Sequence, residues 1–412
     1  MVFGNDEVTV SLKFNKYRML KEEIKQLAKE IHGDVIVNRR HLHAHPELSF
    51  QEYETSAFIK SRLDEMGIPW KPMANTGVVA IIKGEKSFDR VIALRADIDA
   101  VPTTETSDVE YASKFKGAMH ACGHDVHTSS LLGTARILQA IKSKFGGTVK
   151  LIFQPGEEKI PGGASLMIKE GVLKNPVPDS VIGQHVMTNI DCGKIGIKKG
   201  MFMASHDEIY VTIRGKGGHG AIPHLNIDPV IIAAHILVAL QQIVSRMANP
   251  VFPTVLSFGK VIANGVTNVI PDEVYLEGTF RSFDENWKNE AHKRMKKMAE
   301  GIAESMGGSC EFNIVRGYPF LKNEEKLTEQ VTSFAKEYLG KENVLDLDCF
   351  MGGEDFAYYS QVIDSCFYFL GTGNKEKGIV SSVHSSTFDI DENALAISTG
   401  LMTYIALKQL GN

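Results

Sequence analysis

The sequence has little of what several common classes of protein require. Its 45 lysines and arginines do not outnumber its 50 aspartates and glutamates, and the formal net charge of −5 lacks the positive surplus that holds a nucleic acid or an anionic membrane. No continuous apolar run approaches the roughly 18 residues that span a bilayer, and the first residues carry acids rather than a hydrophobic signal core. These absences predict a cytoplasmic protein without nucleic-acid or membrane partners.

Cysteine is scarce as well, and two catalytic signatures are missing. The five cysteines are odd in number and widely scattered, which is poor material for a disulfide framework and fits a reducing compartment. The HExxH helix of zinc proteases and the GxSxG elbow of serine hydrolases are both absent. We therefore expect any special cysteine to have a chemical role rather than a structural one.

The chain nevertheless has ample material for folded domains. Its 412 residues, 43% of them hydrophobic, predict two or three domains. After a first dozen residues expected to form a loose arm, Leu20, Ile24, Leu27 and Ile31 recur at helical spacing and predict an amphipathic helix that opens the fold.

Short, almost uniformly apolar runs then indicate strands that are buried on both faces. They lie at residues 78–82, 91–94, 149–153, 181–183 and 367–370. Helical stretches lie between them, at residues 56–66, 128–142 and 326–339. This alternation predicts an α/β domain in which a mixed sheet carries helices on both faces.

The segment 204–318 has a different order of strand-like and helical stretches. Strand-like stretches at 208–213, 254–261, 274–280 and 310–315 are interrupted by helical stretches at 229–247 and 286–306. That order, βαββαβ, predicts a ferredoxin-like module. We expect it to be an inserted lid or dimerisation domain, with residues 1–203 and 319–412 forming the catalytic domain.

The motif MHACGHDVH, residues 119–127, is the most informative stretch of the chain. It holds Cys122 and His124 two positions apart, ahead of a helical run. A thiolate and a neutral imidazole are the donors that zinc and its neighbours prefer, and this spacing lets both reach one site. Taken alone, the motif also fits a small buried cysteine with histidines that satisfy a helix start.

Further donors follow the buried strands, where active sites of α/β sheets gather. Glu158, His185 and His384 complete a candidate set with Cys122 and His124. Five ligands suggest two divalent metal ions that activate a water molecule. Thiolate and imidazole favour zinc, while manganese, cobalt or nickel are alternatives. Residues that could bind metal or hold the ligands in place are Asp97, Asp99, Asp125 and His127.

The pair Glu157 and Glu158 is the second strong signal. Adjacent residues of extended backbone point in different directions, so one carboxylate can bind metal while Glu157 acts as general base. A solvated acidic loop is the alternative. In the inserted segment, His219 lies among glycines, and Arg281 could clamp a carboxylate with paired hydrogen bonds. Ordinary turn glycines and a surface salt bridge are the corresponding alternatives.

Together these motifs resemble the amidohydrolase branch of the aminoacylase and carboxypeptidase metallopeptidases, which includes N-acyl-amino-acid, hippurate and indole-acetyl-amino-acid hydrolases. Nine motifs in order carry the resemblance over most of the chain. They are RRHLHAHPELSFQE from Arg39, LRADIDAVPTTE from Leu94, MHACGHDVH from Met119, FQPGEE from Phe153, GKGGHGAIPH from Gly215, NVIPDE from Asn268, GTFR from Gly278, MGGEDFAYY from Met351 and VHSSTFDIDE from Val383.

The resemblance implies which residues act and on what. The ligands of two metals per subunit would be Cys122, His124, Glu158, His185 and His384. Glu157 would be the base, His219 would reach the substrate oxygen in the partner subunit's site, and Asn268 and Arg281 would hold the substrate carboxylate. The expected enzyme cleaves an N-acyl amino acid to a carboxylic acid and a free amino acid, as a homodimer or higher homo-oligomer formed through the lid.

Some features depart from the family's pattern or leave alternatives open. Related peptidases have a histidine ligand where Asp97 stands, followed by an acid at Asp99, so whether this pair binds metal stays open. Proline is common at Ser386, and a larger small residue at Gly156. The same centre would also serve a metallo-carboxypeptidase or dipeptidase. A non-catalytic binding protein is a further alternative, but it would be expected to have lost ligands or Glu157.

Overall fold

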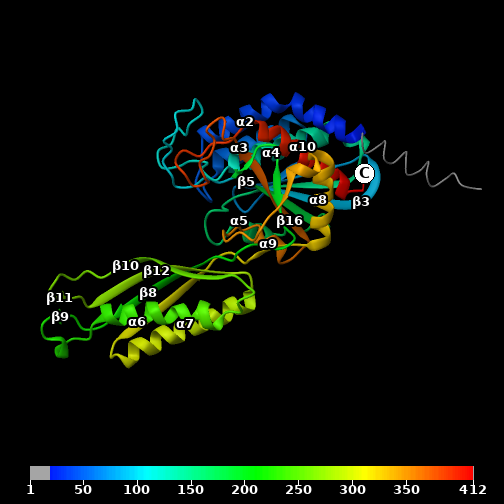
Figure 1. Cartoon of the computed structure of the whole chain (residues 1–412). Helices are drawn as coiled ribbons and strands as arrows, with labels where there is room; N and C mark the ends of the chain where they lie inside the picture. Colours follow the sequence, from blue (N-terminus) through cyan, green and yellow to red (C-terminus); the bar gives the residue numbers. More distant parts are fainter. Residues whose placement is uncertain (1–18, 412) are drawn as a thin grey trace, which may run out of the picture. The chain divides into compact units, whose positions relative to one another are not determined.

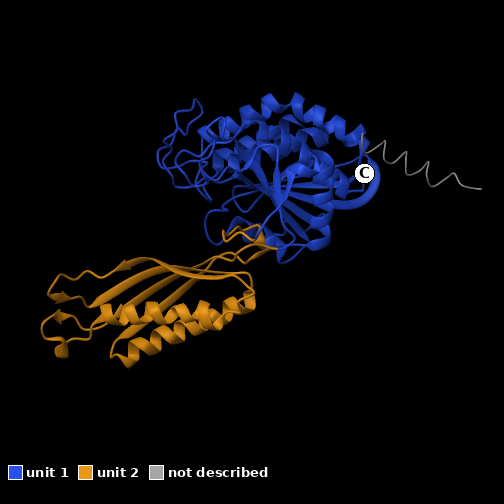
Figure 2. Ribbon diagram, in the orientation of Figure 1, with its two compact units in different colours: residues 1–200, 322–348, 358–412 blue, residues 201–321, 349–357 orange. Residues whose placement is uncertain are grey.

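A computed structural model describes residues 19–411 and divides them into two compact units (Figure 2). The first unit contains described residues up to Gly200, Lys322–Asp348 and the chain from Tyr358 onward; the second contains Met201–Leu321 and Cys349–Ala357. The sequence had placed the short segment 349–357 with the catalytic domain. The predicted N-terminal arm lies outside the described residues.

The first unit is built on an eight-stranded mixed sheet with the order β1-β2-β4-β3-β5-β16-β6-β15 (Figure 1). Its four central strands, β4, β3, β5 and β16, run parallel, whereas β2 pairs antiparallel with β4 and β6 with β16. The strands are β1 Trp70–Met73, β2 Gly77–Lys83, β3 Lys86–Asp97, β4 Gly146–Gln154, β5 Ser180–Asp191, β6 Ile195–Ile197, β15 Val344–Asp346 and β16 Ser365–Gly373.

Both faces of this sheet are covered. Successive strand residues point to opposite faces, yet all nine residues of β16 and eight of the nine in β4 are buried. Helix α4 packs against β3 and β5 and against α2 and α10, while α5 packs on β4 and α8 on β16. Residues 19–30 are helical, as predicted, and the other helices are α2 His32–Ala44, α3 Tyr53–Glu65, α4 His124–Ala140, α5 Gly163–Lys169, α8 Glu325–Leu339, α9 Ala357–Ser360 and α10 Asn393–Gln409.

The second unit has the predicted βαββαβ order and a four-stranded antiparallel sheet with the order β10-β12-β8-β13. Buried and half-buried residues alternate along β8, so one face of the sheet carries the core, where helices α6 and α7 pack (Figure 1). Its main elements are β8 Asp207–Arg214, α6 Pro229–Gln242, β10 Thr254–Ile262, β12 Glu273–Ser282, α7 Glu285–Ser305 and β13 Ser309–Arg316. The expected fold class is thereby confirmed.

Short elements complete the two units. Strands β9 Gly218–His219 and β11 Val269–Ile270 pair with each other in the second unit. Strands β7 Gly200–Met203 and β14 Leu321–Asn323 lie where the chain passes between the units. Single turns are η1 Lys142–Lys144, η2 Pro223–Leu225 and η4 Lys341–Asn343, and a π-helix, η3 Ile243–Met247, continues α6.

One helix is apolar over the length of a membrane span without being a continuous apolar run. By length and composition, Pro229–Met247 is the one helix among the described residues that is apolar enough to cross a bilayer. A count of continuous apolar residues missed it because His235, Gln241 and Gln242 interrupt the run. Its buried residues, which include Ile232 and Ile236, belong to the hydrophobic core of the second unit.

Candidate metal centre

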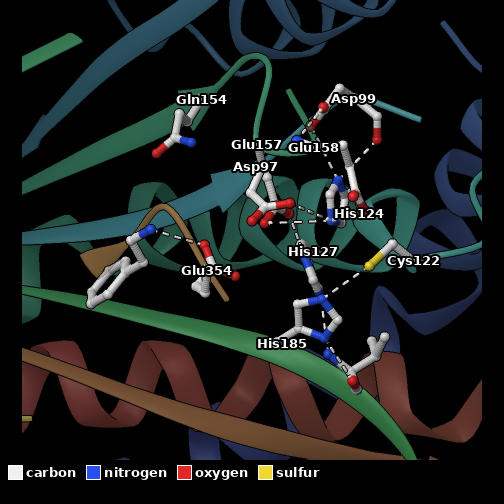
Figure 3. A network of polar contacts seen from close by, with 12 residues as sticks. Asp97, Asp99, Cys122, His124, His127, Gln154, Glu157, Glu158, His185 and Glu354 are labelled. Atoms are coloured by element: carbon white, nitrogen blue, oxygen red, sulfur yellow. Dashed lines mark hydrogen bonds and ion pairs between the residues drawn. The ribbon is translucent and has the colours of Figure 1, made fainter. Parts of the chain in front are cut away.

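The predicted donors of the first unit converge at the carboxyl ends of its parallel strands, and Figure 3 shows the predicted ligands other than His384, namely Cys122, His124, Glu158 and His185. Asp97 ends β3, Glu157 and Glu158 follow β4, and His185 lies within β5. His384 is in the connection that follows β16. These four strands are neighbours in the sheet, so residues far apart in sequence reach one place.

The loop before α4 brings in the two remaining donors. Cys122 and His124 flank Gly123, whose φ of 81° is left-handed, and a Cβ there would lie 2.4 Å from Val186 Cγ2. Only glycine suits both the conformation and the space. The tight turn sets the Cys122 thiol in the loop and His124 on the first turn of α4, so that both face the same site.

Two groups of donors share the Cys122 sulfur. Its Sγ lies 3.2 Å from His185 Nε2 and 3.2 Å from His384 Nε2. His384 Nε2 is also 3.1 Å from Glu158 Oε1, which lies 3.9 Å from His124 Nε2. Donors around one tetrahedral zinc are separated by roughly 3.4–3.6 Å, given ligand distances of about 2.0–2.3 Å. The two groups, Cys122–His124–His185 and Cys122–Glu158–His384, therefore have the spacing of adjacent cation sites.

The histidine rings are oriented so that Nε2 faces these groups. His124 Nδ1 lies 2.9 Å from the Asp99 carbonyl oxygen, and His185 Nδ1 lies 2.7 Å from that of Val186. A carbonyl can only accept, so each Nδ1 donates, and in the neutral ring each Nε2 keeps its lone pair. His124 Nε2 is fully buried and has no hydrogen-bond partner within residues 19–411. A buried, unpaired nitrogen of this kind suits a metal ion.

The electrostatics of the site also call for a cation. Burial, followed by Glu158 and Glu157, raises the pKa of the Cys122 thiol well above its usual value. Burial alone would lower the pKa of His124, but Asp97 and Asp99 outweigh it and raise that pKa to about 10. Both shifts have the same physical source, because the surrounding carboxylates favour positive charge. A divalent ion would supply that charge and stabilise the thiolate.

Asp97 and His127 form a buried chain that ends on the strand carrying His185. Arg95 Nη1 donates to Asp97 Oδ2 over 2.7 Å, and His127 Nδ1 donates to Asp97 Oδ1. The Val186 N–H donates to His127 Nε2 over 2.9 Å. Both nitrogens of His127 are thus engaged, which favours a role in positioning β5 over direct metal binding.

Asp99 is engaged in a similar way on the other side of the site. Its Oδ2 accepts from Ser49 Oγ at 2.6 Å and from the Glu158 N–H at 3.0 Å, while its Oδ1 lies 3.2 Å from His124 Nδ1. One carboxylate therefore orients two predicted ligands. The neighbouring Glu157 is buried, with Oε2 4.0 Å from His124 Nε2.

Several supporting residues were missed from the sequence. Arg39 of α2 donates to Asp125 Oδ2 over 2.8 Å, and Glu52 Oε1 accepts the Gly156 N–H at 2.8 Å just before Glu157. Arg95 was noted only as a polar residue after a predicted strand and was given no role, whereas it is fully buried beside Asp97. The motif that begins at Arg39 was the available signal, but its residues were given no individual roles.

The three residues predicted to bind substrate lie in the second unit, where two of them are close together. His219 pairs with Val269 through β9 and β11, and the Gly220 N–H donates to the Asn268 carbonyl oxygen over 2.8 Å. His219 and Asn268 are both exposed. Arg281 lies at the opposite end of β12, roughly 27 Å beyond Glu273 at about 3.4 Å per residue. Its Nη1 is buried and has no hydrogen-bond partner in the described chain.

Comparison with known proteins identifies a family whose members this chain resembles. Residues 93–408 match the family model described as peptidase family M20/M25/M40. The N-acetyl-L-cysteine deacetylase of Bacillus subtilis is 42% identical over 408 residues, covering 99% of this chain and 93% of that protein. Thermostable carboxypeptidase 2 of Saccharolobus solfataricus is 38% identical over 393 residues, covering 94% of this chain and 98% of that protein.

A solved structure agrees with these sequence matches. It is a Bacillus subtilis protein described as a dinuclear metal binding peptidase from the M20 family. It is 36% identical to this chain, with a TM-score of 0.77, and the match covers 93% of this chain and 99% of that one. The donor groups around Cys122 are thus found in a chain whose structural relative is described as binding two metals.

Proposed function

Because this chain belongs to peptidase family M20/M25/M40, we propose that it is a metal-dependent amidohydrolase that cleaves N-acyl amino acids to a carboxylic acid and a free amino acid. Family membership confirms the resemblance carried by the nine sequence motifs. The observation that supports the proposal most strongly is the pair of donor groups that share Cys122, with the buried carboxylate of Glu157 beside them. The similar N-acetyl-L-cysteine deacetylase indicates small N-acyl groups as substrates.

We assign Cys122, His124 and His185 to one metal, and Cys122, Glu158 and His384 to the other. The soft thiolate and the imidazoles favour zinc, with manganese, cobalt or nickel as alternatives. When bound, two such ions would polarise the substrate carbonyl and lower the pKa of a water molecule towards neutrality.

The chain's own contribution to the chemistry is proton transfer by Glu157. Its carboxylate does not belong to either group that shares Cys122, and it lies beside both. In our proposal Glu157 accepts a proton from the attacking water and delivers it to the leaving nitrogen as the amide bond breaks. The Asp99 carboxylate holds the Glu158 backbone, and Glu52 holds that of Gly156, so the Glu157 backbone is fixed on both sides.

For substrate binding we propose the three residues that the family resemblance implies. Arg281 and Asn268 would hold the free carboxylate of the amino acid, and His219 would contact the substrate oxygen. The unpaired, buried Nη1 of Arg281 supports an anion partner for that guanidinium. His219 and Asn268 lie together on and beside the separate β9–β11 pair, which ends three residues before β12 begins, whereas Arg281 lies near the far end of β12. We therefore propose that His219 and Asn268 serve the site of a partner subunit, where they meet the partner subunit's Arg281.

If residues of one subunit serve the site of another, the protein must be at least a homodimer, and we propose that the dimer forms through the second unit. Strand β10 is an edge of its sheet, and α6 exposes Ile231 and Val238, the latter with 74% of its surface accessible. A second copy would cover both features. We also propose a cytoplasmic location, because all five cysteines are free.

A carboxypeptidase or dipeptidase activity is the second candidate, favoured by the similarity to thermostable carboxypeptidase 2. Release of free amine from N-acetyl amino acids, N-benzoyl amino acids and dipeptides, each measured with the zinc-loaded protein, separates the candidates. We expect kcat/KM to be highest for the N-acyl amino acids. Faster cleavage of dipeptides would favour the alternative, and no amine release from any of them, with any of the four metals, would contradict both.

A further inference from the structure

Arg39 is one of the largest fully buried side chains of the first unit and has no contact with solvent. A buried guanidinium is strongly unfavourable unless acids pair with it. Here Nε donates to Asp125 Oδ2 over 2.8 Å, and Nη2 donates to Asp389 Oδ1 over 2.9 Å. Arg39 therefore bridges two carboxylates that are 264 positions apart in the sequence.

Each of these carboxylates belongs to a segment that carries a predicted metal ligand. Asp125 directly follows His124 in the first turn of α4. Asp389 is five positions after His384, in the connection between β16 and α10. The bridge made by Arg39 thus joins the segment of Cys122 and His124 to the segment of His384.

The His384 segment has little regular structure of its own, and its backbone is tied to the Cys122 segment by the His384 N–H, which donates to the Ala121 carbonyl oxygen over 2.7 Å. Residues 374–392 contain no helix or strand, and the His384 side chain is 55% exposed. His384 itself has a left-handed φ of 64°, which is unfavourable for a residue with a side chain. A segment of this kind would lose conformational entropy on binding a metal unless the protein orders it beforehand.

Neighbouring groups fix both ends of the bridge. His43 Nδ1 lies 2.8 Å from Asp125 Oδ2, and Tyr111 donates its hydroxyl hydrogen to Asp389 Oδ2 over 2.8 Å. The Arg39 guanidinium also stacks over the Tyr111 ring, 4.8 Å from its centre. Arg39 is held by contacts on several sides, so its two carboxylate partners have little freedom to separate.

We propose that Arg39 is a positioning residue that orders the His124 and His384 segments relative to each other before the metals bind. The inference rests on the proposed function only in requiring that the site binds metals. Loss of a group that orients ligands typically weakens metal binding by about 10- to 100-fold. The Cys122–Glu158–His384 group should be affected more than the Cys122–His124–His185 group, because His384 has the less ordered backbone.

The adjacent Arg40 offers a matched control. Its side chain is 41% exposed and makes two hydrogen bonds to Glu392, of 2.8 and 2.7 Å, but none to Asp125. Arg40→Met removes an arginine and an ion pair on the same helix and leaves both hydrogen bonds of the bridge in place. It also removes contacts to Glu392 and to the Tyr111 ring, which Arg39 shares at 3.6 Å and 4.8 Å and keeps in this variant. A general effect of charge or of α2 stability would appear in both variants, whereas a positioning effect would appear in Arg39→Met alone.

The test is titration of the metal-free full-length protein with Co²⁺, followed by visible absorption and by competition with a chelator. The charge-transfer absorption band between the thiolate and cobalt reports on Cys122. Each of the two binding steps reports on one donor group, and we expect the weaker, second step to belong to the Cys122–Glu158–His384 group. We expect Arg39→Met to weaken the second step by about 10- to 100-fold. We expect Arg39→Lys, which keeps the charge but not the two-armed geometry, to restore part of the loss, and Arg40→Met to resemble the unaltered protein.

A second variant keeps the test decisive if Arg39→Met does not fold. Asp389→Asn neutralises one end of the bridge at a half-buried position, and we expect it to weaken the same step. Wild-type affinity and absorption in a folded Arg39→Met or in Asp389→Asn would overturn the inference, even if the melting temperature falls. Failure of the unaltered protein to bind Co²⁺ would instead contradict the proposed function.

Discussion

Each of the two units buries a cluster of charged groups, and the clusters differ in how their charge is balanced. In the second unit, Asp207 of β8 lies 3.0 Å from His292 Nε2 and 3.7 Å from Lys288 Nζ, both on α7. In the first unit, the carboxylates around Cys122 raise the pKa of its thiol, and His124 Nε2 is left without a hydrogen-bond partner in the described chain.

The difference separates a structural cluster from a binding site. Burying a charge is unfavourable unless a partner compensates it, so a cluster compensated by its own lysine and histidine can serve stability. A cluster whose carboxylates raise the pKa of both the Cys122 thiol and His124 favours an added cation. Substitutions in the second unit should therefore act on unfolding, and those in the first on metal binding and turnover.

The largest expected effect is on catalysis. Glu157→Gln removes the proposed base and keeps the shape of the side chain, so turnover of an N-acyl amino acid should fall on the order of 10²- to 10⁴-fold. Elemental analysis should show an unchanged metal content, and the melting temperature should not fall. Near-normal turnover in this variant would show that Glu157 is not the base.

The next effect is on the stability of the second unit. Asp207→Asn removes the buried anion beside His292, while Lys288 keeps Glu285 at 2.9 Å. The free energy of unfolding should fall by about 3 kcal/mol, as when one partner of a buried pair is removed. Chemical denaturation followed by tryptophan fluorescence measures it. If the variant is as stable as the unaltered protein, the charge of Asp207 does not contribute to the fold.

The unaltered protein and Asp207→Asn should also differ in how their free energy of unfolding depends on pH. Burial disfavours the charged form, but His292 and Lys288 outweigh it and lower the pKa of Asp207. A lowered pKa on folding means that the contribution of Asp207 is complete above the unfolded value of about 3.9 and is lost as pH falls through the folded value. The difference in unfolding free energy between the two proteins should shrink as pH falls below about pH 4. A difference independent of pH would contradict the ionic origin.

The smallest effect concerns the helix that carries Lys288 and His292. Asp284 caps α7 by accepting from the Trp287 N–H at 2.9 Å, and Asp284→Ala should lower the free energy of unfolding by about 1 kcal/mol. This change leaves Asp207 in place. The decrease in stability that follows from protonation of Asp207 below about pH 4 should therefore be the same in Asp284→Ala as in the unaltered protein. If Asp284→Ala no longer showed this decrease at low pH, the charged cluster around Asp207 would depend on the helix cap.

The fold could largely be predicted because burial leaves a clear pattern in the sequence. The run 149–153 became β4, buried on both faces, and the alternating stretch 208–213 became β8, buried on one. Three-residue strands such as β6 and β15 have too few positions for a pattern. The placement of Cys349–Ala357 in the second unit depends on contacts with residues far earlier in the chain, for example between the Ala204 N–H and the Phe350 carbonyl oxygen.

The site was predicted as a set of donors but not as an arrangement. The chemistry of thiol and imidazole identified Cys122 and His124, and strand ends supplied the other three ligands. That one sulfur belongs to both groups could not be predicted, because His185 and His384 lie 63 and 262 positions from Cys122. The same holds for Arg39, whose partners are 86 and 350 positions away.

The most direct test of a binuclear centre around Cys122 is the metal content of the purified protein after equilibration with zinc and dialysis. We predict two equivalents per chain in the unaltered protein and the loss of both in Cys122→Ala, because that sulfur belongs to both donor groups. A protein that binds no zinc or any other divalent metal, or a Cys122→Ala variant that retains two equivalents, would contradict the account.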